Sequence, residues 1–109
     1  MNKWHWKEIE IYEEHLVDEN DNVIARLMYT DYGTVLNGWR CIFYNKECNT
    51  KYVNQIYANS IEEARWQATL WIHNECNFIA NSYHRIRDHL PSIHELAEAA
   101  IKRRDIEGV

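Results

Sequence analysis

Ser60-Ile61-Glu62-Glu63-Ala64 is the stretch of this 109-residue chain that decides its fold. The Ser60 hydroxyl can accept a hydrogen bond from the backbone N–H of Glu63, whose own side chain can reach back to the cap. Behind this capping box the apolar residues recur at helical spacing, which marks one buried stripe: Ile61, Ala64, Ala68, Trp71, Ile72, Ile79, Tyr83, Ile86 and Leu90. The pattern predicts a long helix over residues 61–90.

Two further signals complete the helical half of the chain. Pro91 ends the long helix, because the residue before a proline is pushed out of helical geometry, and a bend is expected near Asn81-Ser82. Ser92-Ile93-His94-Glu95 forms a second capping box. It predicts a shorter C-terminal helix over residues 93–105.

Upstream of the helices, turn signals divide residues 1–58 into strand-like segments. Four are expected, over residues 8–17, 23–30, 39–44 and 51–58. Short connections between consecutive strands favour an antiparallel meander. The chain is therefore predicted to be one α+β domain spanning residues 1–109, with a four-stranded sheet packed on the long helix and a short C-terminal helix.

Both faces of the predicted sheet carry large apolar residues. Trp39 and Phe43 alternate onto one face, and the other face holds Ile24, Met28, Ile42 and Tyr44. The long helix can cover only one of these faces. We therefore expect the C-terminal helix or a partner to cover the second, and a regulatory module that dimerises through this second face is an alternative function.

The formal charge of −5 is segregated in the first third of the chain. Residues 1–31 hold eight acids and three bases, whereas the remaining residues hold nine of each and are neutral. On a strand, Glu8 and Glu10 are expected to project from one face roughly 6.6 Å apart. The candidate partner-binding carboxylates are Glu8, Glu10, Glu13, Glu14, Asp18, Glu19 and Asp21.

A row of carboxylates can occupy a basic groove that normally holds nucleic acid. The alternative is an edge strand that uses solvated charge to prevent unwanted pairing. Five Trp and seven Tyr exceed what one small core needs, so Tyr29 and Tyr32 are expected on the contact surface. Trp4 and Trp6 are expected to cap the core, with exposed binding anchors as the alternative.

Catalytic and metal-binding signatures are absent from the sequence. Neither Ser60 nor Ser92 lies in a glycine elbow, and three glycines leave no phosphate-binding loop. His73 and Cys76 are three residues apart on the predicted helix and could share a metal ion, but the spacing of known zinc sites is missing. We therefore expect no catalytic residues, no metal and no cofactor, and a protein that is not an enzyme.

Direct nucleic-acid binding is also not expected. Basic residues cluster near the C-terminus (Arg85, Arg87, Lys102, Arg103 and Arg104), but nearby acids balance them. No apolar run approaches the roughly 20 residues of a membrane helix, and the N-terminus lacks the apolar core of a signal peptide. Three cysteines, an odd number, fit a reduced, cytoplasmic setting.

The chain resembles small single-domain proteins encoded by bacteriophages and mobile elements, a class rather than one named family. The resemblance lies in a short β-meander with Val23-Ile24-Ala25 and Trp39, followed by Ser60–Ala64 opening a long helix. Many such proteins inhibit host defence nucleases, and anti-CRISPR proteins are among them. The resemblance implies a non-enzymatic inhibitor in the host cytoplasm whose acidic surface competes with nucleic acid for a protein partner.

Overall fold

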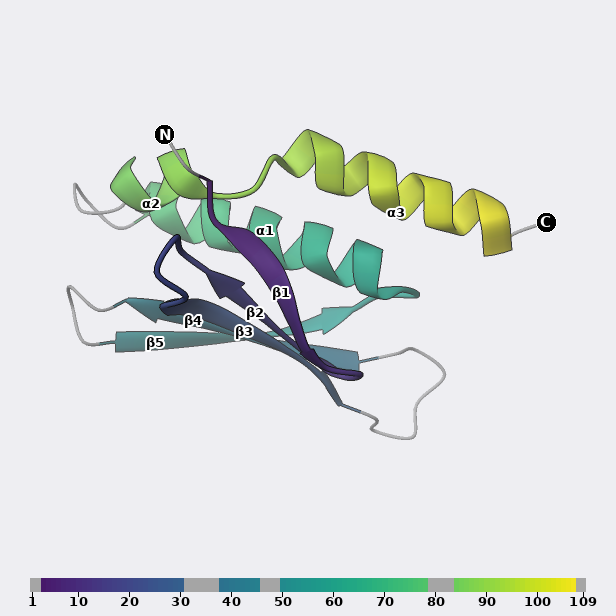
Figure 1. Cartoon of the computed structure of the whole chain (residues 1–109), viewed down its shortest axis with the longest axis horizontal. Helices are drawn as coiled ribbons and strands as arrows, with labels where there is room; N and C mark the ends of the chain where they lie inside the picture. The colour runs from purple at the N-terminus through teal and green to yellow at the C-terminus, as the bar shows by residue number, and fades with distance from the viewer. Residues whose placement is uncertain (1–2, 31–37, 46–49, 79–83, 108–109) are drawn as a thin grey trace.

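Strands in sequence order build one antiparallel sheet, and the helices follow it (Figure 1). The computed structural model describes residues 3–30, 38–45, 50–78 and 84–107. Within them the sheet has five strands in the order β1-β2-β3-β4-β5. Their bounds are β1 (His5–Glu10), β2 (Glu13–Val17), β3 (Val23–Thr30), β4 (Gly38–Asn45) and β5 (Thr50–Tyr57). The helices are α1 (Ile61–Phe78), α2 (His84–His89) and α3 (Ile93–Glu107).

The α+β class and the antiparallel meander are confirmed, but the predicted count of four strands is wrong. The segment expected as one strand over residues 8–17 is a hairpin that turns at Ile11-Tyr12. This turn lacks Gly, Pro, Asn and Asp, the residues that mark turns in a sequence. The hairpin places Trp6 opposite Leu16, so both side chains face α1 and are shielded from water.

The core lies between α1 and one face of the sheet. Fully buried side chains come from β2, β3 and β4 and meet small or aliphatic residues of α1: Leu16, Ala25, Leu27, Cys41, Phe43, Ala64, Ala68 and Ile72. The alanines at i and i+4 let the helix backbone approach the sheet closely. Cys41 is a free thiol, and burial raises its pKa above the usual value.

The helices stack on one side of the sheet. Figure 1 shows α1 between the sheet and α3, with β1 rising from its hairpin past α1 toward α2. We expected either the C-terminal helix or a partner to cover the second sheet face. The C-terminal helix does not cover it. Among the described residues, no helix lies on that face.

Both predicted serine caps begin helices where expected, and the Glu63 carboxylate accepts hydrogen bonds from Gln67 and Arg104. Ser60 Oγ accepts a hydrogen bond from Glu63 N at 3.1 Å, and Ser92 Oγ accepts one from Glu95 N at 3.3 Å. The predicted helix over residues 61–90 is described as α1 and α2, and the expected bend at Asn81-Ser82 falls outside the described residues. The helix predicted over 93–105 extends to Glu107.

Trp4 and Trp6 anchor β1 to the helices, as the core-capping interpretation predicts. Trp6 Nε1 donates to Thr69 Oγ1 at 2.9 Å. The Trp4 ring stacks on His89 with centroids 5.0 Å apart, and its backbone N–H donates to the His89 carbonyl at 2.9 Å. In the described part of the chain, no helix has the length and apolar character needed to cross a membrane.

Core packing predicts a large difference between two aliphatic positions of the sheet. Leu27 is fully buried, whereas Ile11 is 81% exposed at the hairpin turn. We expect Leu27→Ala to lower the free energy of unfolding by about 2–5 kcal/mol. Ile11→Ala should change it by less than about 0.5 kcal/mol. Urea unfolding of both variants measures the difference, and equal losses would contradict the assignment of the core face.

Candidate functional site

Two adjacent carboxylates of β2 lie on opposite faces of the sheet. Glu14 is opposite Leu27 of β3 and faces α1, whereas Glu13 is opposite Met28 and faces the helix-free side. Strand side chains alternate between faces, so the two acids cannot act on one ligand. Each has its own cation.

Glu14 is buried and paired with Arg65 of α1. The Arg65 Nε donates to Glu14 Oε1 at 2.6 Å, and its Nη2 donates to Glu14 Oε2. This bidentate contact raises the pKa of Arg65, and Glu62 and Glu8 add smaller electrostatic contributions. A carboxylate that is 4% exposed needs such a partner, because a buried charge without one is very costly. The pair therefore fixes β2 to α1 rather than offering a site to a ligand.

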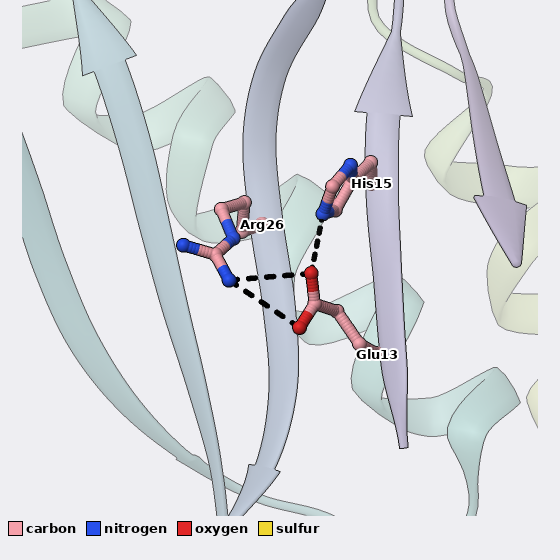
Figure 2. Close-up of polar contacts among 3 residues, drawn as sticks. All are labelled: Glu13, His15 and Arg26. Atoms are coloured by element: carbon pink, nitrogen blue, oxygen red, sulfur yellow. Dashed lines mark hydrogen bonds and ion pairs between the residues drawn. The ribbon is translucent and has the colours of Figure 1, made fainter. Parts of the chain in front are cut away.

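Glu13 is held in a cluster on the helix-free face (Figure 2). His15 Nε2 lies 2.6 Å from Glu13 Oε2, and Arg26 Nη2 donates to both oxygens at 3.2 and 3.3 Å. The hydrogen bond with His15 is the largest cause that lowers the pKa of Glu13, and Arg26 lowers it further. The side chain of Arg26 is also hydrogen-bonded to Tyr44 of β4, and this hydrogen bond is the main reason that the pKa of Arg26 is raised. Glu13 is therefore an ion-paired carboxylate within the sheet.

The acids of the β2–β3 turn serve the turn itself. Asp18 accepts hydrogen bonds from the backbone N–H groups of Asn20 and Asn22 at 2.8 and 2.9 Å. Asp21 has a φ of 61°, a left-handed conformation that Asp tolerates, and its carboxylate lies 3.6 Å from Lys7 Nζ. Glu19 is exposed at the outer end of this turn. Of these three acids, Glu19 has no hydrogen bond or ion pair within the described residues.

The remaining predicted acids, Glu8 and Glu10, lie next to exposed apolar side chains. Both carboxylates are exposed on β1. Ile9, between them, is 44% exposed, and Ile11 and Tyr12, which follow Glu10, are 81% and 62% exposed. We call residues 8–12 the hairpin tip. The register of β1 shifts between Glu8 and Glu10, so Glu8 is opposite Glu14 and Glu10 is opposite Glu13.

This bulge overturns the expectation that Glu8 and Glu10 project from one face. Opposed residues in an antiparallel pair share a face, so one extra residue sends the two carboxylates to opposite faces. The seven candidate partner-binding acids therefore do not form a single row. The structure distributes them over the hairpin tip, two ion-paired positions of β2 and one turn.

The predicted tyrosines have different outcomes. Tyr29 is half-buried, with its ring centroid 5.2 Å from Tyr12 and 5.1 Å from Trp39, so it supports the turn of the hairpin. Tyr32 falls outside the described residues. Whether these residues bind a partner stays a prediction.

Sequence reasoning missed the hairpin tip as a group. The strand predicted over residues 8–17 includes Ile9 and Ile11, and no turn signal separates them from Leu16. The partner cations Arg26 and Arg65 were also missed, because they are 13 and 51 residues from the acids that they bind. One signal for an ion pair was available in the sequence: a glutamate on the core face of a strand, such as Glu14, needs a cation as partner.

No group of three or more potential metal ligands occurs among the described residues. Of the two residues weighed for a metal, the His73 side chain is half-buried on α1, and that of Cys76 falls outside the description. His94 and Glu98 form an exposed contact of 3.0 Å one helical turn apart on α3.

The Glu14–Arg65 pair predicts strong coupling between two residues. Arg65→Met leaves a buried carboxylate without its cation, and we expect the free energy of unfolding to fall by about 3–5 kcal/mol. Adding Glu14→Gln should recover much of that loss. Arg104→Met, which breaks the more exposed contact with Glu63, is the control and should cost less than about 1 kcal/mol. Additive losses in the Glu14 and Arg65 variants would argue against the coupling.

The lowered pKa of Glu13 predicts a contribution to stability that depends on pH. A carboxylate whose pKa is lower in the folded state than its usual 4.5 stabilises the fold above that pH. The contribution is lost as the pH falls through the folded-state pKa. Glu13→Gln should therefore flatten the fall in unfolding free energy below about pH 4.5. Denaturant unfolding at a series of pH values tests this, and parallel curves for wild type and Glu13→Gln would refute it.

Comparison of the chain with protein-family models, with curated proteins and with solved structures finds no match. The likeness to small phage-encoded inhibitors therefore stays a prediction from the sequence. What the protein does has to be argued from the contacts, exposure and charge of its own residues.

Proposed function

We propose that this protein is a non-enzymatic inhibitor that binds a nucleic-acid-processing protein through its hairpin tip. The observation that carries the proposal is the composition of the tip, which presents Ile9, Ile11 and Tyr12 to solvent beside the exposed carboxylates of Glu8 and Glu10. Large apolar side chains exposed together, with charges at the rim, are typical of protein-binding surfaces.

The chemistry of the tip is complementary to a groove that binds single-stranded nucleic acid. Such grooves combine cations that follow the phosphates with apolar or aromatic platforms on which bases stack. Glu8 and Glu10 lie on opposite faces of the tip, so a tip inserted into such a groove would present one carboxylate to the cations of each wall. The exposed ring of Tyr12 matches a stacking platform. The tip would therefore displace nucleic acid by occupying both parts of the groove.

The other acids support the tip rather than extend it. Glu14 and Glu13 are neutralised by Arg65 and by Arg26, and both pairs hold β2 in place beneath the tip. Tyr29 packs against Tyr12 from β3 and donates its backbone N–H to the Tyr12 carbonyl at 2.9 Å. A tip held on a sheet in this way loses little conformational entropy when it binds.

The proposal places the protein in the cytoplasm, where nucleic-acid-processing proteins work and where the free thiol of Cys41 stays reduced. It assigns no catalytic role to the protein. The two charged clusters of β2 are closed by internal ion pairs, so they serve structure in this proposal. The resemblance to phage-encoded inhibitors points to a bacterial partner.

A charge reversal at the tip tests the proposal. Glu8→Lys/Glu10→Lys should abolish retention of the partner on immobilised protein, because both carboxylates would then repel a basic groove. Glu98→Lys/Asp105→Lys, on exposed positions of α3, changes the net charge by the same amount and should leave retention unchanged. The measurement is capture from nuclease-treated bacterial extract with each variant, followed by identification of the retained proteins.

Competition decides whether the retained protein is of the proposed kind. A single-stranded oligonucleotide added to the column should release it, and raising the salt concentration should weaken retention. Retention of the same proteins by the tip variant, or retention that an oligonucleotide leaves unchanged, would overturn the proposal.

A further inference from the structure

The two edges of the sheet differ in how they are protected. β1 has a bulge between Glu8 and Glu10 and carries three charged side chains in six residues. β5 has eight residues in an unbroken register with β4, no proline, and Lys51 as its one charged side chain. Bulges and charges prevent edge strands from pairing with other chains, and β5 has few such features.

The open part of the β5 edge has a defined length. No backbone hydrogen bond within the described residues joins 51–56 to a strand other than β4. At the next residue, the Tyr57 carbonyl accepts a hydrogen bond from Gln67 Nε2 of α1 at 3.2 Å, so the edge is closed there. Val53 is one of the two central residues of the open stretch, and its side chain is 55% exposed.

We propose that two copies of this protein pair antiparallel through β5, with Val53 on the two-fold axis. Lys51 then lies opposite the partner's Gln55, and Tyr52 lies opposite the partner's Asn54. The two five-stranded sheets become one continuous sheet. A two-fold interface uses the same patch on both copies, and an antiparallel strand paired about its own midpoint meets this condition.

Side-chain chemistry favours this register. Val53 meets the partner's Val53, so two exposed β-branched side chains contact each other across the strands, which is a favourable cross-strand pair. Lys51 is directly opposite an amide, so no two like charges are opposed. The edge strand therefore offers a self-complementary surface.

Pairing through the second sheet face is less favourable. Arg26, Arg40 and Lys51 lie on that face, since they alternate with residues that face α1. A face-to-face dimer would enclose these charged side chains, together with the Glu13–His15–Arg26 cluster, between the two copies, and removing charges from water is costly. Edge pairing leaves this face exposed to water in both copies and avoids that cost.

The interface is small, because one strand from each copy and few flanking side chains contribute to it. Interfaces that bury less than about 1,200 Å² are weak or transient. We therefore expect a reversible dimer with a dissociation constant in the micromolar range, about 10⁻⁶ to 10⁻⁴ M.

Charge substitutions on the two-fold axis test the register. Val53→Lys and Val53→Glu each place two like charges opposite one another in the homodimer, and we expect each to weaken dimerisation by about tenfold or more. An equimolar mixture of the two variants should dimerise again, because opposite charges then meet on the axis. Val53→Thr keeps a β-branched side chain and is the control that should still dimerise. Sedimentation velocity between about 1 µM and 1 mM measures the wild-type protein, the three variants and the mixture.

Each outcome supports or overturns the proposal. Circular dichroism must show that the variants are folded, which is expected at an exposed position. A wild-type protein that stays monomeric at about 1 mM overturns it. So does a dimer that both single variants retain, which would place the interface elsewhere. The proposal is also overturned if the protein is a monomer and captures another protein in a way that depends on residue 53. In that case the β5 edge would pair with a strand of that other protein.

Discussion

One helix can cover only one face of a sheet, and the rest of this structure depends on that constraint. The side chains of β2 alternate between the face under α1 and the open face. Glu14 therefore lies under α1 and is enclosed there, so it needs Arg65. Glu13, one residue earlier, lies in a half-exposed cluster with Arg26. The alternation of side chains between the two faces of β2 therefore determines the environment of each carboxylate.

The same constraint determines how much of the negative net charge is available at the surface. A segregated run of acids in the sequence suggests a continuous acidic surface. In the folded protein, two of these acids are neutralised in the sheet and one organises a turn, so their charge contributes less to any surface. What is left at the edge is a pair of exposed carboxylates beside the exposed apolar side chains of the hairpin tip. In the proposed function, such a surface would select a partner by shape and apolar contact as well as by charge, which would make it more specific than a polyanion.

Much of the fold could be predicted because its signals are local. The serine caps, the helical stripe and the alternation in β3 and β4 each depend on residues within one element. The hairpin of β1 and β2 could not be predicted in this way, because its turn at Ile11-Tyr12 contains no turn residue and is held by Tyr29 from another strand. The ion pairs were missed for a similar reason, since their partners meet only after the strands and α1 have packed.

The two edges of the sheet are suited to different kinds of contact, so the two proposed interactions do not compete. The bulge in β1 interrupts its hydrogen-bonding register, so this edge is suited to contacts made by side chains. The regular register of β5 makes its edge suited to backbone pairing. Because three strands separate the two edges, a dimer joined at β5 would leave both hairpin tips free and at opposite ends of the continuous sheet. A dimer of this kind would bind two target sites at once, and its apparent affinity would rise through effective concentration without any new contact at the tip.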